Sequence, residues 1–333
     1  MNPKVSVCVP VFNGELYIAE LIESLIAQSF SDIEIIISDN ASIDKTPEII
    51  KSYAAKDARI QYFRNAENIG YSRNIAAAVL KARCEYIAIY HSDDVYHPQI
   101  IEKELSLLES DSSIGGVFTY PAIFYNNIKK AERKNYYKIF SKMGLFQREF
   151  NAFVGRYEDY FPLLLEYGNI FACPSFMTRK KIFLKIGGFT DLYPSNEDFE
   201  LWIKYLKCGW KLGVINDYLL YYRMSNNHAS AYWRRRPEIA VMYKVIDEML
   251  ISKNKLSQYE RTLYAKNKAI GYARSAVNAA AIKNYSKAHA FSLISRNEFS
   301  LSPFSFWGFA QKFPKLAFFL KKFIDYLNQY VFR

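Results

Sequence analysis

The sequence predicts an α/β fold in which a mostly parallel, Rossmann-like sheet carries helices on both faces. Within residues 1–120, short β-branched runs alternate with stretches of helical periodicity. The runs are almost continuously apolar, which is typical of parallel strands buried on both faces. Carboxamides or carboxylates follow each of these runs, and in such sheets ligands bind beyond the carboxyl ends of the strands.

The expected elements follow one another in a regular order. The strands are expected at residues 4–10, 33–39, 60–65 and 86–90, and the helices at residues 16–26, 45–55, 72–82 and 98–109. Thr46 is expected as the N-cap of the second helix, with Pro47 at its first position, and Pro98 opens the fourth helix.

The second half of the chain has a different character. Residues 120–161 form an aromatic and basic stretch, which we expect to be an insertion or a mobile loop over the site. After about residue 233 the pattern becomes almost wholly helical and strongly basic. We therefore expect a catalytic domain at residues 1–232 and a helical C-terminal region at residues 233–333.

The composition indicates the kind of partner. Lys and Arg outnumber Asp and Glu by 44 to 33, a formal charge of +11, which favours nucleic acid, phosphorylated small molecules or an acidic membrane. The four cysteines lack metal or CxxC spacing and are expected in the reduced core of a cytosolic protein. The N-terminus lacks a signal-peptide pattern, and no uncharged apolar stretch reaches about 18 residues.

Asp93 and Asp94 directly follow the expected strand at residues 86–90. Adjacent carboxylates raise each other's pKa unless a cation, hydrogen bonds or water relieve the repulsion. Carboxylate oxygens suit Mg²⁺ or Mn²⁺, which share their coordination shell with substrate phosphates. The pair is therefore a candidate metal site, and the alternative is a solvated turn before a helix.

Further charged residues stand at element ends. Asp39 ends the second expected strand, where a carboxylate can accept hydrogen bonds from a nucleoside. Arg73 lies at a helix start, where the positive end of the helix dipole disfavours a cation. Its position is therefore better explained by contact with a nucleotide phosphate. Glu197 and Asp198 open the helical segment EDFELWIKYLK, where either a capping box from Ser195 or a general base is consistent with the pattern.

Together these motifs resemble the GT-A-fold glycosyltransferases of family 2. The matching segments run in order through about residues 3–232 and are VSVCVPVFN, IIISDNASIDKTPEI, NIGYSRNIAAA, YIAIYHSDD, GGFTDLYPSNEDFELW and YYRMSNNHAS. The resemblance implies an inverting transfer from a nucleotide sugar, a UDP-sugar by default, to a glycan or polyprenyl-linked acceptor. The pathway implied is the biosynthesis of surface polysaccharide or glycoconjugate.

The resemblance also implies residue roles. It places Pro10, Phe12, Asn13, Asp39, Arg73 and Asp93 at the nucleotide, Asp93 and Asp94 at a divalent Mn²⁺ or Mg²⁺, Asp198 as the catalytic base, and Glu197, Trp202, Arg223 and His228 near the acceptor or substrate. Relatives often carry a further acid where this chain has His91, and a histidine where it has Ser225. We therefore expect His91 to be structural.

The C-terminal segment favours a membrane surface. Its apolar residues at helical spacing are Leu316, Phe319, Leu320, Phe323 and Leu327, and Lys312, Lys315, Lys321 and Lys322 surround them. A basic amphipathic helix can lie in a membrane interface, and the run 234–236 of arginines would attract anionic lipid. The alternative is a helix packed on the catalytic domain. We expect a cytoplasmic protein bound peripherally at the inner face of the cell membrane.

Three alternative functions fit the sequence less well. A metal-dependent nucleotidyltransferase acting on sugar phosphates would need a Gly-rich basic loop after the first strand, and VPVFNGELYIAEL has one glycine and no cation. A nucleic-acid-binding protein would fit the charge, but the basic residues concentrate outside the motif-bearing half, so no nucleic acid is expected. An inactive scaffold is disfavoured because Asp39, Asp93, Asp94 and Asp198 are all present.

Overall fold

The computed structural model describes residues 3–125, 127–224, 241–252, 256–281, 284–299, 310 and 312–317. The chain divides into two compact units, one built from Met1–Phe161 and Ile170–Met224 and the other from Pro162–Asn169 and Ser225–Arg333. The domain boundary expected after residue 232 falls within residues 225–240, which lie outside the described residues.

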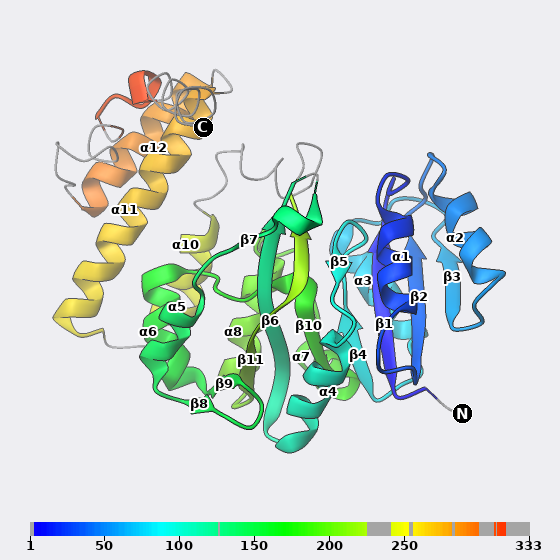
Figure 1. Cartoon of the computed structure of the whole chain (residues 1–333). Coiled ribbons are helices and arrows are strands. Elements are labelled where there is room, and N and C mark those ends of the chain that lie inside the picture. The colour runs from blue at the N-terminus through cyan, green and yellow to red at the C-terminus, as the bar shows by residue number, and fades with distance from the viewer. Residues whose placement is uncertain are drawn as a thin grey trace. The chain divides into compact units, whose positions relative to one another are not determined.

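The first unit is built on one sheet with the strand order β3-β2-β1-β4-β10-β6-β11-β9-β8 (Figure 1). Two short strands lie off this path, β5 beside β11 and β7 beside β6. The strands are β1 (Val5–Val11), β2 (Ile33–Asp39), β3 (Ile60–Arg64), β4 (Tyr86–Ile89), β5 (Val95–Tyr96), β6 (Ile114–Phe124), β7 (Glu132–Arg133), β8 (Phe146–Gln147), β9 (Ala152–Gly155), β10 (Phe176–Arg179) and β11 (Lys211–Arg223).

The predicted fold class is confirmed. Strands β3, β2, β1 and β4 pair in parallel, so their carboxyl ends meet at one edge. Beyond β4 the sheet becomes mixed, because β10 runs antiparallel to both β4 and β6, while β11 runs parallel to β6. The parallel half carries the alternating pattern that the sequence showed, and the antiparallel strands come from the second half of the unit.

Helices cover both faces of the sheet, which explains why all seven residues of β1 are buried. Figure 1 shows α1 and α4 in front of the sheet and α3 behind it. The helices of this unit are α1 (Ile18–Ile26), α2 (Thr46–Ala54), α3 (Tyr71–Lys81), α4 (Ile100–Ser110), α5 (Tyr137–Phe140), α7 (Lys180–Ile186) and α8 (Glu197–Lys207), and α6 (Tyr157–Tyr167) spans the boundary between the units.

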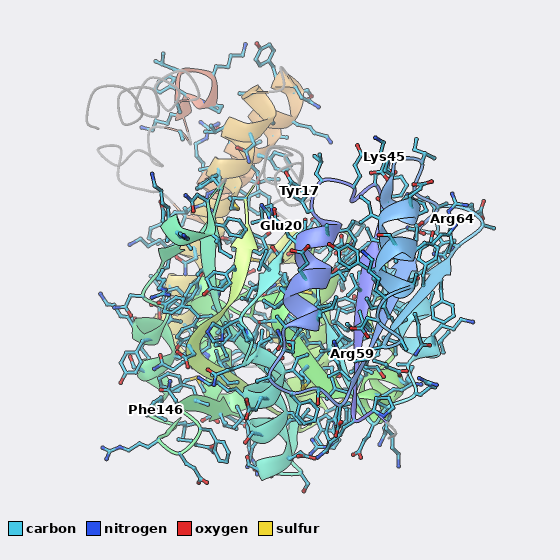
Figure 2. The ribbon with its side chains drawn as sticks, turned by 45° about the vertical axis from the view of Figure 1, so that its right-hand side comes forward. Tyr17, Glu20, Lys45, Arg59, Arg64 and Phe146 are labelled. Atoms are coloured by element: carbon cyan, nitrogen blue, oxygen red, sulfur yellow. The ribbon has the colours of Figure 1, made fainter. Side chains whose placement is uncertain are left out.

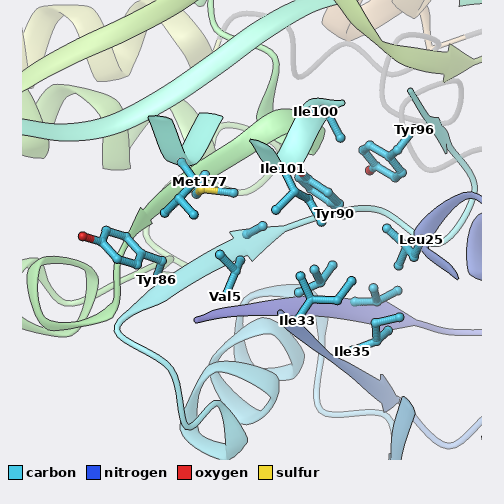
Figure 3. Close-up of a cluster of buried hydrophobic side chains, with 14 of the residues drawn as sticks. Val5, Leu25, Ile33, Ile35, Tyr86, Tyr90, Tyr96, Ile100, Ile101 and Met177 are labelled. Carbon is cyan, nitrogen blue, oxygen red and sulfur yellow. The ribbon is translucent and has the colours of Figure 1, made fainter. Parts of the chain in front are cut away.

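The core of the parallel half lies between the sheet and α1 and α4. Alternate residues of β1 and β2, such as Val5 and Ile33, face Leu25 of α1 and Ile101 of α4 in one buried cluster (Figure 3). Period-2 alternation in the strands and the i, i+3, i+4 spacing in the helices place these side chains on facing surfaces. This packing fixes the strand ends that carry the candidate site.

Two local expectations were wrong. Residues 146–155 do not form a loop over the site, because they contribute β8 and β9, and β9 extends the sheet beyond β11. Thr46 does not cap α2 but begins it, because the N-cap residue is Lys45, and the N–H of Thr46 donates to Asp44 Oδ1 at 3.0 Å. The hydroxyl of Thr46 accepts a bond from Gly14 N–H, so it ties two loops together.

A buried acid in α4 provides a stability test. Glu104 is fully buried, its Oε2 accepts a bond from the Tyr90 hydroxyl at 2.6 Å, and its Oε1 has no hydrogen-bond partner. Burial raises the pKa of Glu104 well above its usual range, so the protonated form is favoured in the folded state. Stability is then greatest below the unfolded-state pKa of about 4.3 and is lost as pH rises through the folded-state pKa.

We therefore expect Glu104→Gln to raise the free energy of unfolding at pH 8, because the amide keeps the Tyr90 bond and is neutral without taking up a proton on folding. The gain should shrink as pH falls toward the pKa of an exposed glutamate. Urea unfolding of both proteins between pH 5 and pH 8 measures this. A difference that stays constant over this range would show that Glu104 is not held in its neutral form.

The second unit is helical in the parts that the structure describes. Its helices are α10 (Val241–Val245), which continues into a π-helical turn at Ile246–Ile251, α11 (Gln258–Ala281) and α12 (Tyr285–Glu298). The Ser295 hydroxyl donates to the Ala269 carbonyl at 2.6 Å between α12 and α11. Gly271 leaves room for the ring of Tyr243, which a Cβ there would meet at 2.0 Å. Among the described helices, none has the length and apolar character that a bilayer span requires.

Candidate active site

The candidate site lies at the edge where the parallel strands end. In Figure 2, Tyr17, Glu20, Lys45 and Arg64 mark this end of the sheet, and Arg59, which precedes β3, lies toward the opposite end. The predicted site residues come from the loops after β1, β2 and β4 and from the starts of α3 and α8. Parallel pairing brings the first three of these loops to one edge.

Hydrogen bonds join the loops after β1 and β2. Asn13 adopts a left-handed conformation, with φ of 50°, and its Oδ1 accepts from Ile43 N–H at 2.9 Å. Its own N–H donates to the Ser42 hydroxyl at 2.8 Å. Phe12, directly before it, is 48% exposed, whereas Pro10 is buried within β1. These bonds hold an exposed aromatic ring and an amide at the end of β1.

Asp39 ends β2 and is fully buried. Its Oδ1 accepts from Ser42 N–H at 2.9 Å, and its Oδ2 accepts from the Tyr62 hydroxyl at 2.7 Å. The Nε of Arg64 lies 3.5 Å from Oδ2 and supplies a countercharge. Both oxygens are thus engaged by the protein, and the carboxylate shapes the loop that holds Asn13. A nucleoside contact at Asp39 stays a prediction.

Arg73 lies in the first turn of α3 and is exposed. Its Nε stands 3.7 Å from Oδ2 of Asp191, and both side chains are largely exposed. Exposed ion pairs contribute about 0–1 kcal/mol, so this pairing holds Arg73 only weakly. Helix α3 follows Gly70, which has a φ of 86° that glycine adopts without strain. Arg73 therefore points outward from a fixed helix start.

Asp93 and Asp94 form the turn after β4. Asp94 is 1% exposed, its Oδ1 accepts from Arg223 N–H at 2.8 Å, and its Oδ2 has no hydrogen-bond partner. Burial and the neighbouring charge of Asp93 raise the pKa of Asp94 well above its usual range. A buried carboxylate oxygen without a donor is costly, and a bound cation would remove that cost.

The side chain of Arg223 connects this turn to α1. Its guanidinium lies 4.5 Å from the ring centroids of Tyr17 and Phe124. Its Nη2 is bonded to the Glu20 carboxylate, and its Nε donates to the carbonyl of Asp93 at 2.9 Å. Arg223 is only 6% exposed, so it does not face an acceptor as expected. It holds the turn that carries the two carboxylates.

The residues at this turn fit a divalent metal. Donor atoms of His91, Asp93 and Asp94 all lie within 4.8 Å of one another. The unpartnered Oδ2 of Asp94 and a neighbouring carboxylate provide the hard oxygen donors that Mg²⁺ and Mn²⁺ prefer. Sequence reasoning set His91 aside as structural, but the structure groups it with these acids.

Helix α8 carries the second set of acids. Asp198 lies in its first turn, and its Oδ1 accepts from Phe199 N–H at 2.7 Å. The expected capping box from Ser195 does not form, because the N-cap residue is Asn196 and Ser195 has a φ of 68°. Burial raises the pKa of Glu197, opposed by backbone hydrogen bonds that its carboxylate accepts.

Trp202 lies beneath the site and not on its surface. It is fully buried, and its ring packs against Phe118 and Phe176 with centroids 4.7 and 4.4 Å away. The expected contact with an acceptor is therefore wrong, since the apolar side of α8 uses this ring to anchor the helix to the sheet. His228, the remaining candidate, lies outside the described residues.

Two residues that sequence reasoning missed join the halves of the site. The hydroxyl of Tyr71 lies 2.9 Å from His91 Nε2 and 3.8 Å from Cys173 Sγ. Burial raises the pKa of the Cys173 thiol, and the charges of Asp198 and Asp94 both act in the same direction. Tyr71 thus connects His91 in the turn after β4 to Cys173, whose pKa also responds to the charge of Asp198 at the start of α8.

Comparison with known proteins agrees with this geometry. The sequence model of the family described as Glycosyl transferase family 2 matches residues 6–186. An uncharacterized glycosyltransferase of Methanocaldococcus jannaschii is 30% identical over 231 residues, which cover 68% of this chain and 72% of that protein. An uncharacterized glycosyltransferase of Rickettsia typhi is 30% identical over 208 residues, which cover 62% of this chain and only 59% of that protein.

Solved structures share the fold. S. aureus TarS 1–349 in complex with UDP-GlcNAc has a TM-score of 0.62 at 18% identity, covering 95% of this chain and 89% of that chain. The mannosyltransferase PcManGT from Pyrobaculum calidifontis, in complex with GDP-Man and Mn²⁺, has a TM-score of 0.59 at 17% identity. The match covers 98% of this chain and 88% of that chain. The fold is that of the GT-A glycosyltransferase class. Within it, the chain belongs to glycosyl transferase family 2.

Proposed function

We propose that this protein transfers a sugar, with inversion, from a nucleotide sugar to a glycan or polyprenyl-linked acceptor in the biosynthesis of surface polysaccharide or glycoconjugate. A UDP-sugar is the donor that we propose to test first. The observation that carries the proposal is the group of donor atoms from His91, Asp93 and Asp94, which lie within 4.8 Å of one another, beside the acids in the first turn of α8. Inversion requires a base on one side of the sugar and a stabilised leaving group on the other, and we assign the first to Asp198 and the second to the metal held by Asp93 and Asp94.

The donor side is formed by the loops after β1 and β2. Phe12 offers an exposed ring and Asn13 an amide, and Arg73 offers a weakly held guanidinium to a phosphate. Pro10 and Asp39 would support the nucleoside from beneath, since both are buried. The hydrogen bonds between the loops hold these groups in place before a ligand arrives, which lowers the entropy lost on binding.

Asp93 and Asp94 would hold Mn²⁺ or Mg²⁺. When bound, the ion would neutralise charge that develops on the leaving diphosphate. The backbone N–H of Arg223 donates to the Asp94 carboxylate, and its Nε donates to the main-chain carbonyl of Asp93, so Arg223 holds the turn that carries both acids. Asp93 would also lie near the ribose, so it serves the nucleotide and the ion together.

Asp198 is the proposed base, taking the proton from the acceptor hydroxyl as that oxygen attacks the anomeric carbon. Asp198 lies in the first turn of α8, where the positive end of the helix dipole stabilises its negative charge. The buried ring of Trp202 fixes the helix on the sheet, so the carboxylate has a defined direction. Glu197, beside it, is proposed to contact the acceptor.

A peripheral position at the cytoplasmic face of the membrane is part of the same proposal. Among residues 312–317, Phe313 and Leu316 are exposed, and Lys312 and Lys315 lie in the same short segment. Apolar and basic side chains together suit an anionic lipid surface, where a lipid-linked acceptor would be found.

A thermal-shift panel of nucleotide sugars tests the proposal. UDP-, dTDP- and GDP-sugars, each with Mn²⁺, Mg²⁺ or chelator, should identify one nucleotide that raises Tm by several degrees only with metal. A ligand at a hundred times its Kd stabilises the native state by about 2.7 kcal/mol. The control is the matching nucleoside triphosphate with a sugar 1-phosphate. Pyrophosphate release from that pair, without stabilisation by any nucleotide sugar, would replace the proposal with a nucleotidyltransferase.

A further inference from the structure

The turn after β4 carries His91, a third potential metal ligand beside the two carboxylates. Donor atoms of His91, Asp93 and Asp94 lie within 4.8 Å of one another, the one such group of three or more among the described residues. Asp94 is 1% exposed, and its Oδ2 has no hydrogen-bond partner. A cation at this point would satisfy an oxygen that the protein leaves unsatisfied.

His91 is held on both its backbone and its ring. Its N–H donates to the Tyr96 hydroxyl at 2.7 Å, and that hydroxyl donates in turn to the carbonyl of Pro174 at 2.9 Å. Its Nε2 lies 2.9 Å from the Tyr71 hydroxyl, with the two rings edge to face at 5.8 Å. A histidine that only filled space would not need this degree of orientation.

A hydrogen-bonded second nitrogen is the usual support of a metal-bound imidazole. Such ligands nearly always donate their other ring N–H to an outer partner, which fixes the tautomer and the direction of the ring. Tyr71 is placed to be that partner, because it begins α3 directly after Gly70 and its hydroxyl reaches His91. With Nε2 supported in this way, Nδ1 is the nitrogen that would bind the metal.

We infer that His91 is a nitrogen ligand of the divalent ion and sets which metals the site prefers. This inference rests on the proposed metal-dependent function. Two carboxylates and a neutral imidazole balance a charge of +2, so the histidine adds a donor without adding charge. Imidazole suits first-row transition metals, whereas Mg²⁺ favours an all-oxygen shell. The site should therefore favour Mn²⁺ and, more strongly, Co²⁺ over Mg²⁺.

The test measures metal binding directly and does not depend on turnover. Mn²⁺, Co²⁺ and Mg²⁺ are titrated into the full chain with UDP present, and pulsed EPR of bound Mn²⁺ reports coupling to a ligand ¹⁴N nucleus. In the wild type we expect imidazole ¹⁴N coupling. In His91→Asn this coupling should vanish, and the affinity for Mn²⁺ and Co²⁺ should fall about tenfold or more.

Two further variants separate ligation from folding. His91→Asp replaces the imidazole nitrogen with a carboxylate oxygen. This variant should still bind metal, but its ratio of Co²⁺ to Mg²⁺ affinity should be roughly tenfold lower. Tyr71→Phe keeps the ring and removes the outer hydroxyl, so the ¹⁴N coupling should persist while Co²⁺ affinity falls. His97→Asn, a partly buried histidine outside the cluster, is the matched control and should change neither readout.

The outcomes distinguish this inference from the function on which it rests. If Asp94→Asn abolishes metal binding while His91→Asn retains the ¹⁴N coupling and the wild-type metal order, His91 is not a ligand and the carboxylate site stands. If the wild type with UDP binds none of the three ions, the metal-dependent function and this inference both fail. Loss of ¹⁴N coupling in His91→Asn with Mg²⁺ affinity unchanged supports the inference.

Discussion

Asp198→Asn should lower kcat for sugar transfer by about 10²–10⁴-fold, the usual contribution of a positioned general base. The amide has the same shape, and its oxygen can still accept the bond from Phe199 N–H that the carboxylate makes at 2.7 Å. Helix α8 should therefore keep its start, and the donor Kd should stay within about twofold of the wild type because the change removes only a step of proton transfer.

Steady-state transfer assays and calorimetric titration of the donor measure these two quantities separately. Glu102→Gln is the matched control, since Glu102 also lies in the first turn of a helix, α4, and loses its charge in the same way. It should leave kcat unchanged. Turnover that is equally unaffected in Asp198→Asn would remove Asp198 from the mechanism, and a weakened donor Kd would assign it to binding.

The parallel half of the fold was predictable because its burial is uniform. Strands covered on both faces must be apolar along their whole length, so β1 and β2 stand out from the helices between them. Strands β8 and β9 gave no such signal, because two and four residues are too few for a pattern. Strand β9 pairs with β11 and β8 pairs with β9, and these pairings form only in the folded chain.

The candidate site shows the same division. Asp93, Asp94 and Asp198 could be chosen because their residue type and their place at element ends already indicate chemistry. Arg223 could not be assigned correctly, since its role comes from a bond to a carboxylate 129 positions earlier and from ring contacts on two other elements.

Neutral or apolar residues were harder still to identify. The residue types of Tyr71 and Cys173 do not indicate a site, and only the distances from the Tyr71 hydroxyl to His91 and to Cys173 reveal their place. The local sequence does not identify a residue that acts through its neighbours in space, whereas a charged residue at the end of a strand can be identified from the sequence.

Asp94→Asn should abolish metal-dependent donor binding and, in the same protein, raise the stability of the metal-free fold. Asp94 is almost fully buried beside another carboxylate, and its Oδ2 has no partner. In the folded state, Asp94 costs free energy either as a buried anion or through the uptake of a proton. An isosteric amide is neutral and has neither cost. The amide oxygen can still accept from Arg223 N–H, so the turn should persist. The gain should be roughly 1–3 kcal/mol.

Thermal melts with and without Mn²⁺ and UDP measure both effects, and Asp111→Asn supplies the contrast. The Lys211 ammonium and Ser113 hold the pKa of Asp111 well below its usual range, so its charge stabilises the fold above the unfolded pKa, and the amide should lower Tm at neutral pH. The same change at Asp94 should raise Tm and remove the response to metal. The two changes in Tm are expected to have opposite signs because the charge of Asp111 is stabilised within the protein, whereas the carboxylate of Asp94 would be stabilised only by a bound cation. A fall in Tm for Asp94→Asn with the metal response intact would make this carboxylate structural.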